Sequence, residues 1–216
     1  MRALLGLACL AAVAASIGDL LMLYVANSLR PELGLATPGP AVLWVGGLLG
    51  VAGIPLYAVG YRAASRAASD GSLGVARLIF LAGAGASGVG ALIHGLTAFL
   101  IHSEVGSVAP GRSPLEAIAS WGPGLVVLWS LACLLVVVAS LTILRAGLAR
   151  SSDLPRWWGW LNPAFATIAI AAVASGSELG RSFVVPAAPN LAHLVFFSAS
   201  LVAFRLLPSS APKERP

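Results

Sequence analysis

A small set of ionisable and polar side chains interrupts the apolar stretches of this 216-residue sequence. Asp19 lies in the first stretch, His94 in the third and His193 in the sixth, with Asn190 one turn before His193. A charge within a bilayer costs at least ~2.5 kcal/mol on insertion scales, so such residues are candidate functional sites. A histidine beside a carboxylate is suited to proton exchange near neutral pH, and an Asp19–His94 pair would have this chemistry.

The four side chains lie at similar depths when each is counted from the basic end of its own stretch. At 1.5 Å per residue, Asp19 lies about 24 Å along its helix and His94 about 26 Å. Asn190 and His193 lie about 22 and 18 Å along theirs. We therefore predict a ligand-binding pocket formed by these four residues in the outer half of the membrane. The alternative interpretation is an Asp–His pair and an Asn that only tie helices together.

The pattern does not predict a metal site or another cofactor. Zinc needs three or four ligands at about 2.0–2.1 Å, and only Asp19, His94 and His193 are candidates. No HxxxH or HExxH spacing supports them. His102 lies ~12 Å further along the helix than His94, which places it at the outer headgroups.

The elements that must position these residues are membrane-spanning helices. Hydrophobic residues make up 58% of the chain and charged residues 10%, against about 25% charged in a soluble domain. The mean hydropathy of +0.92 leads to the same conclusion. The basic residues are dispersed and not interleaved with aromatic ones, so nucleic-acid binding is not predicted despite the pI near 10.0.

The apolar stretches predict an all-α bundle of six transmembrane helices in one domain, residues 1–208, followed by a short polar tail, 209–216. Each stretch is close to the ~20 residues that cross the hydrocarbon core. We interpret the first stretch as an uncleaved helix, because its apolar character continues beyond the length of a signal peptide. The predicted helices are 3–26, 40–61, 76–101, 121–146, 160–178 and 188–207.

The positive-inside rule places both termini in the cytoplasm. Ten basic residues fall on the side of the termini: Arg2, Arg62, Arg66, Arg77, Arg145, Arg150, Arg156, Arg205, Lys213 and Arg215. Three fall on the other side: Arg30, Arg112 and Arg181. The aromatic residues are expected at the two membrane interfaces, with Tyr24, Trp44 and Trp121 at the outer one and Tyr57, Tyr61, Trp157, Trp158 and Trp160 at the inner one. The abundance of Arg over Lys and of Ala, Gly and Leu is common in proteins from GC-rich bacterial genomes, so we expect the bacterial cytoplasmic membrane.

Two outer segments carry further polar residues. The run Ser113-Pro114-Leu115-Glu116 has the pattern of a helix N-terminus, and predicts a short interfacial helix over residues 114–119. Glu116 then serves as a capping residue, with a catalytic acid as the alternative. Glu178 and Arg181 are spaced i, i+3 and either pair on one helix face or form a solvated helix end.

Small residues and aromatic residues predict the packing. Gly83, Gly85, Gly88 and Gly90 form overlapping small-xxx-small pairs, which predicts that the third helix lies at the centre of the bundle. Asn162-Pro163 fits a helix N-cap followed by proline in the first turn.

Two families show a resemblance. Gly85-Ala86-Ser87-Gly88 resembles the GxSG motif of rhomboid intramembrane proteases, and Ala192-His193 resembles their Ala-His. This would imply Ser87 as nucleophile and His193 as base. However, Ser87 lies in the third predicted helix instead of the fourth, and the second has no HxxxN pair, so we disfavour this relation.

The second resemblance is broader. Gly18-Asp19, His94 in a Gly-rich helix, Pro155-x-Trp157 with Asn162-Pro163, and Asn190 followed by Phe196-Phe197 resemble a group of uncharacterised small bacterial six-helix membrane proteins. The resemblance implies a fold and a compartment, without an assigned activity.

Three functions remain open at this point. The leading hypothesis is a protein that binds or transports a small, partly lipophilic ligand, with membrane lipids as its surroundings and protons carried by Asp19 and His94. The first alternative is a membrane-embedded isomerase or hydrolase acting on a lipid-like substrate, with His94 or His193 as base. The second is a structural or partner-binding membrane subunit. No feature of the sequence sets an oligomeric state.

Overall fold

The computed structural model describes residues 1–28, 30–68, 73–105, 123–149 and 154–206. The predicted interfacial helix, Glu116 and the tail 209–216 lie outside these residues. All the described elements are helical. They are α1 (Arg2–Asn27), η1 (Pro31–Leu33), α2 (Pro40–Gly53), η2 (Ile54–Leu56), α3 (Tyr57–Ala67), α4 (Leu73–Val105), α6 (Pro123–Leu148), α7 (Arg156–Trp160), α8 (Pro163–Ala174), η3 (Gly180–Val184) and α9 (Val185–Leu206).

Five helical segments are long and apolar enough to cross a membrane: Arg2–Asn27, Pro40–Ala67, Leu73–His102, Gly124–Leu148 and Gly180–Arg205. The second runs through α2, η2 and α3, where Pro55 interrupts the α-helix with one 3-10 turn. The last includes η3, a π-helix. The all-α prediction is confirmed, and these five segments correspond to the predicted spans one to four and six.

The predicted fifth span, 160–178, differs from the structure. Within this range the structure has α8, of 12 residues and about 18 Å long, and a break separates it from α7, of 5 residues, which ends at Trp160. Asn162 causes the break as the predicted cap of α8: its Oδ1 accepts from the Phe165 N–H, while its Nδ2 donates to the Gly159 carbonyl. Pro163 follows at the first position of α8, where its missing N–H costs nothing.

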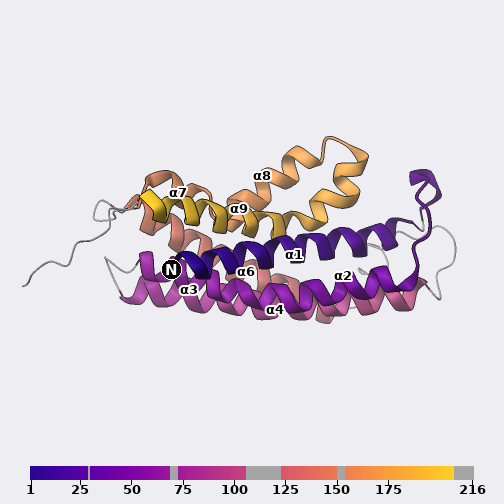
Figure 1. Cartoon of the computed structure of the whole chain (residues 1–216), viewed down its shortest axis with the longest axis horizontal. Coiled ribbons are helices and arrows are strands. Elements are labelled where there is room, and N and C mark those ends of the chain that lie inside the picture. Colours follow the sequence, from indigo (N-terminus) through magenta and orange to yellow (C-terminus); the bar gives the residue numbers. More distant parts are fainter. Residues whose placement is uncertain (29, 69–72, 106–122, 150–153, 207–216) are drawn as a thin grey trace, which may run out of the picture.

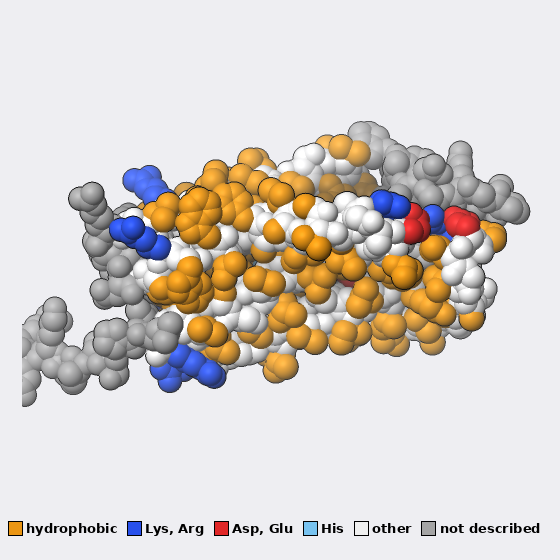
Figure 2. Space-filling view, turned by 90° about the horizontal axis from the view of Figure 1, so that it is seen from above, with side chains coloured by type: hydrophobic (Ala, Val, Ile, Leu, Met, Phe, Trp, Pro, Cys, Tyr) orange, Lys and Arg blue, Asp and Glu red, His pale blue; other side chains and the backbone are white. Residues whose placement is uncertain are grey.

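The long helices lie side by side along the longest axis of the molecule (Figure 1). α1 packs on α2, α3 and α9, α4 packs on α2, α3 and α6, and α8 packs on α9. The N-terminus and the C-terminal end of α9 lie toward the same end of the bundle (Figure 1). On the face shown in Figure 2, apolar side chains cover the sides, basic side chains gather at this end, and acidic and basic ones lie together at the other.

A close backbone approach joins α1 and α2. A Cβ on Gly18 would lie 2.6 Å from the Gly46 carbonyl oxygen, and one on Gly46 would lie 2.8 Å from that of Gly18. The glycines of α4 behave differently from the prediction. Gly88 has nothing within 4 Å of its Cβ position, and Gly83 makes room for the ring of Tyr61. These two α4 glycines therefore do not bring helix backbones together.

Three of the aromatic residues assigned to the inner interface are buried instead. Tyr57, Tyr61 and Trp158 are 1%, 0% and 0% exposed. Each has a polar partner inside the bundle, and for Trp158 this is Ser200, whose Oγ accepts from the indole N–H at 2.8 Å. The interface assignment was therefore wrong for these three, because a polar tip can be satisfied within the protein as well as at the headgroups.

Candidate functional site

Three of the four predicted site residues are in direct contact. Asp19 on α1 lies beside His94 on α4, with 3.2 Å between Asp19 Oδ1 and His94 Nδ1. Asn190 on α9 donates from its Nδ2 to Asp19 Oδ2 at 2.7 Å. Three separate helices thus meet at one carboxylate, as the comparison of depths predicted.

The second nitrogen of His94 contacts the backbone of α2. His94 Nε2 lies 3.2 Å from the carbonyl oxygen of Gly46. The ring lies against Gly50, whose missing side chain leaves the room that it occupies. Through its two nitrogens His94 therefore joins α1 to α2, next to the close approach of Gly18 and Gly46.

These contacts set conditions on where protons lie. A carbonyl oxygen can only accept, so the contact of His94 Nε2 with Gly46 is a hydrogen bond when Nε2 carries the hydrogen. The contact between His94 Nδ1 and Asp19 Oδ1 is an ion pair only when the imidazole is protonated.

Tyr57 extends the network to α3. Its hydroxyl donates to Asn190 Oδ1 at 2.9 Å, which fixes the orientation of the amide. The Tyr57 ring stacks on that of His193, with 4.7 Å between centroids and 24° between planes. His193, the fourth predicted residue, is thus joined to the other three through a ring contact and not by a hydrogen bond.

His193 has its own partners. Its Nδ1 lies 2.7 Å from the carbonyl oxygen of Pro189, one turn earlier in α9, and its Nε2 lies 2.9 Å from the Tyr61 hydroxyl. Because the carbonyl only accepts, Nδ1 carries the hydrogen, and in the neutral ring Nε2 accepts from Tyr61. We call Asp19, His94, Asn190, Tyr57, His193 and Tyr61 the buried polar cluster.

The sequence analysis missed both tyrosines. Tyr57 and Tyr61 are spaced i, i+4 and Asn190 and His193 i, i+3, so each pair lies on one helix face. This matched spacing was the available signal that the two pairs face each other.

Within the Asp19–His94 pair, Asp19 is the more accessible residue, with 13% of its side chain exposed against 4% for His94.

A second group of polar residues lies just after the C-terminal end of α1 and before α9, at the outer surface of the bundle. Arg30 donates from Nη2 to Glu178 at 2.9 Å and from Nε to Glu32 at 2.8 Å. Arg181 also donates to Glu178, at 2.9 Å, so the pairing considered for Glu178 and Arg181 is present. The hydrogen bonds from Arg181 and then Arg30 lower the pKa of Glu178. We call these four residues the outer ionic cluster.

Two further hydrogen bonds beside this cluster attach the end of α1 and Arg30 to η3. Asn27 donates to the carbonyl of Ser182 at 3.0 Å, and Arg30 donates to the Ser182 hydroxyl at 3.1 Å. π-Helical turns such as η3 are frequent at functional sites. Here η3 leads directly into α9, which carries Asn190 and His193.

Ser87 and His193, the residues of the rhomboid-like motifs, have separate hydrogen-bond partners. The Ser87 hydroxyl donates to the Gly83 carbonyl of its own helix at 2.7 Å, while His193 is engaged by Pro189 and Tyr61. Within the described residues, no group of three His, Cys, Asp or Glu side chains is arranged to hold a metal ion. His102 is exposed, and its ring centroid lies 4.9 Å from that of Trp44.

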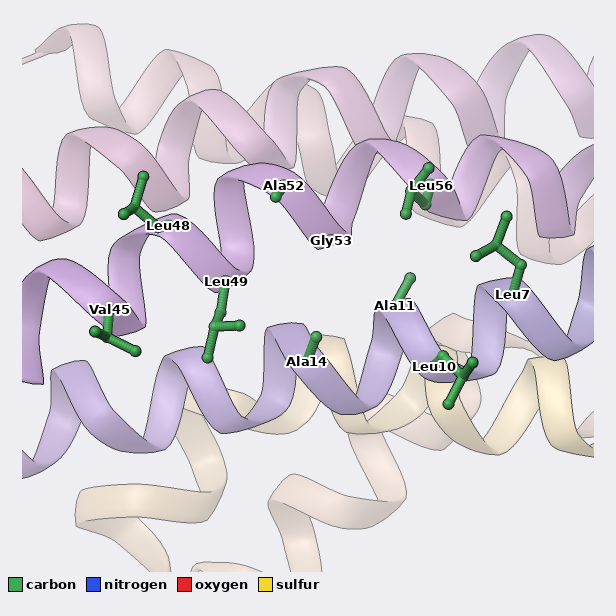
Figure 3. A pocket seen from close by; sticks show the side chains of 10 residues that line it. All are labelled: Leu7, Leu10, Ala11, Ala14, Val45, Leu48, Leu49, Ala52, Gly53 and Leu56. Carbon is green, nitrogen blue, oxygen red and sulfur yellow. The ribbon is translucent and has the colours of Figure 1, made fainter.

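An apolar groove of about 520 Å³ lies between α1 and the α2–α3 segment (Figure 3). Its sides include Leu10 and Leu48, which are 69% and 66% exposed. The groove is therefore open on the outside of the bundle, and it is not the predicted polar pocket. Its lining residues are Leu7, Leu10, Ala11, Ala14, Val45, Leu48, Leu49, Ala52, Gly53 and Leu56.

Comparison with known proteins adds a family. Residues 1–206 match a family of unknown function, DUF6796. The chain belongs to this family. The match covers all the described helices of this DUF6796 protein, including those that carry the buried polar cluster. No curated protein and no solved structure matches the chain.

Proposed function

We propose that this DUF6796 protein binds or transports a small, partly lipophilic ligand in the bacterial cytoplasmic membrane, and that the Asp19–His94 pair couples this activity to proton binding. The observation that carries the proposal is the position of both His94 nitrogens against acceptors. A conformation with these contacts binds one proton at the pair, and a conformation without them need not.

The coupling follows from the hydrogen bonds. When the pair loses its proton, His94 keeps a single N–H, which can serve either Asp19 or the Gly46 carbonyl but not both. The other of these two acceptors then faces the lone pair of the unprotonated His94 nitrogen, and the link between α1 and α2 through His94 is weakened. A proton thus favours one helix arrangement over another, and a ligand that prefers either arrangement changes proton affinity in return.

We further propose six membrane crossings with both termini in the cytoplasm, with α7 and α8 together forming the fifth. The shared end of the N-terminus and α9 supports this (Figure 1). So does the position of the arginines at the helix ends there, Arg2, Arg66, Arg77, Arg145, Arg156 and Arg205. In this topology the 13% exposed Asp19 lies in the outer half of the membrane.

A structural role is the second candidate, and one observation favours it. Asp19, His94, Asn190 and Tyr57 are bonded to one another, which is the arrangement of residues that lock helices together. In this case the cluster stabilises the fold but does not exchange its proton as part of a function.

Thermal unfolding in lipid nanodiscs across a pH series distinguishes the candidates. With coupling, the melting temperature of the wild type falls as pH rises through the range where the pair loses its proton, and a stabilising amphiphile shifts this range. The titratable groups in the cluster are Asp19, His94, Tyr57, Tyr61 and His193. Asp19→Asn should abolish the pH step and the ligand effect, while Glu32→Gln should retain both. A wild type without a pH step leaves only the structural role.

A further inference from the structure

One buried hydroxyl within the bundle has no partner. Ser16 is 5% exposed, and among the described residues its Oγ is the buried side-chain polar atom without a hydrogen bond. Other buried or half-buried helix hydroxyls behave differently: those of Ser87, Thr142 and Ser200 donate to the carbonyl four residues earlier, at 2.7, 2.7 and 2.8 Å. An unsatisfied buried hydroxyl is destabilising, so a partner is expected at Ser16.

Ser16 lies next to the buried polar cluster. It precedes Asp19 by three residues, so both lie on the same face of α1, about 4.5 Å apart along the axis. α1 and α9 are antiparallel, with contacts between Cys9 and Ser198 and between Asp19 and Asn190. Interpolating between these contacts places Ser16 level with residues 191–193 of α9.

The surroundings of Ser16 offer the complementary groups. Asp19 Oδ2 accepts one hydrogen bond, from Asn190, and Oδ1 lies 3.2 Å from His94 Nδ1, so each carboxylate oxygen has capacity for a further hydrogen bond. Asp19 is also the partly exposed member of the pair, which leaves a route for a small molecule to reach it. A group that can both accept and donate would therefore satisfy Ser16 and Asp19 together.

We propose that a hydroxyl-bearing guest binds between Ser16 and Asp19, accepting from Ser16 Oγ–H and donating to the Asp19 carboxylate. The guest is either a water molecule or a hydroxyl group of the ligand. Only binding of a ligand hydroxyl rests on the proposed function; binding of water does not. Water at this position would give the proton on the Asp19–His94 pair a neighbour with which to exchange, since water both donates and accepts.

The test is a structure of the protein in lipid nanodiscs at a resolution that shows ordered water, for the wild type, Ser16→Ala and the matched control Ser87→Ala. We expect density within hydrogen-bond distance of both Ser16 Oγ and Asp19, lost in Ser16→Ala and retained in Ser87→Ala. A compact peak identifies water. Density that continues away from Asp19 identifies a ligand, and mass spectrometry of the extracted molecules then checks for it.

Two results would overturn the proposal: Ser16 Oγ bonded to the Ala12 carbonyl with no density beside it, or density unchanged in Ser16→Ala. Thermal unfolding gives an independent readout. Ser16→Ala should lower the melting temperature because the guest is lost, whereas removing an unpartnered hydroxyl would raise it. A water peak together with a pH-independent melting temperature would support the site while contradicting the proposed function.

Discussion

The buried polar cluster and the outer ionic cluster use similar contacts in opposite surroundings. In each, a carboxylate contacts two side chains on different segments: Asp19 contacts His94 and Asn190, and Glu178 contacts Arg30 and Arg181. However, the His94 side chain is 4% exposed, whereas the side chains of Glu178 and Arg181 are 48% and 55% exposed.

This difference in exposure sets what each cluster can do. Water and salt can replace the contacts of an exposed ion pair, so such pairs contribute little to stability. The His94 side chain is shielded from water, so a lost contact there is harder to replace. Similar contacts thus tie exposed segments together in the outer ionic cluster, and in the interior they form the link that we propose to be sensitive to protonation.

The largest expected effect comes from Asp19→Ala, which removes the shared acceptor of His94 and Asn190. Breaking a buried pair costs about 3–5 kcal/mol, because its partners remain buried and unsatisfied. Thermal or denaturant unfolding in detergent measures the loss. Asp19→Asn keeps an oxygen acceptor and should lose less. If both variants lose only a small and equal amount of unfolding free energy, the Asp19 contacts contribute no more to stability than exposed ion pairs do.

Gly50→Ala tests the position of the His94 ring against α2. The added Cβ would overlap the imidazole, so the ring must move away from Gly46 and Asp19. Overpacking of this kind costs about 1–3 kcal/mol. Gly88→Ala is the matched control on α4, where the Cβ position is open and the change should be neutral or stabilising. A Gly50→Ala protein with the stability and pH response of the wild type would contradict the placement of His94.

Tyr57→Phe should have a smaller effect. It removes the hydroxyl that donates to Asn190 but keeps the ring stacked on His193, so the expected loss is about 1 kcal/mol. Tyr61→Phe removes the bond to His193 and leaves the Asp19 branch intact. We therefore expect the first variant, and not the second, to alter the pH dependence of unfolding. The opposite order would place the proton-sensitive contact at His193.

The smallest effect is expected at the outer ionic cluster. The lowered pKa of Glu178 means that its stabilisation is fully present above the unfolded pKa and is lost as pH falls through the folded one. Arg30→Gln should reduce this acid-side loss and cause a small drop in melting temperature that high salt removes. A drop that persists in high salt would indicate that the hydrogen bonds to Ser182 matter more than the charges.

The sequence predicted how far along its helix each polar residue lies, but it predicted less well which neighbours that residue faces. Residue counting placed Asp19, His94 and Asn190 at one level, because the rise of a helix is fixed. It could not assign Tyr57 to the same site, since an aromatic residue near a span end is equally compatible with an interface position. It also predicted one span over residues 160–178, although it identified Asn162-Pro163 as a cap, whereas α8 begins at Pro163 and ends at Ala174. Hydropathy is averaged over a window, whereas the helix break is set by one side chain.

The central claim is that the Asp19–His94 pair holds a proton, and solid-state NMR tests it most directly. Nitrogen shifts of labelled histidine and carboxyl carbon shifts of labelled aspartate would be recorded in nanodiscs at neutral pH and assigned with His94→Gln and Asp19→Asn. We predict either an imidazolium at His94 beside an ionised Asp19, or a neutral His94 protonated at Nε2 beside a protonated Asp19. A neutral His94 beside an ionised Asp19 would contradict the account.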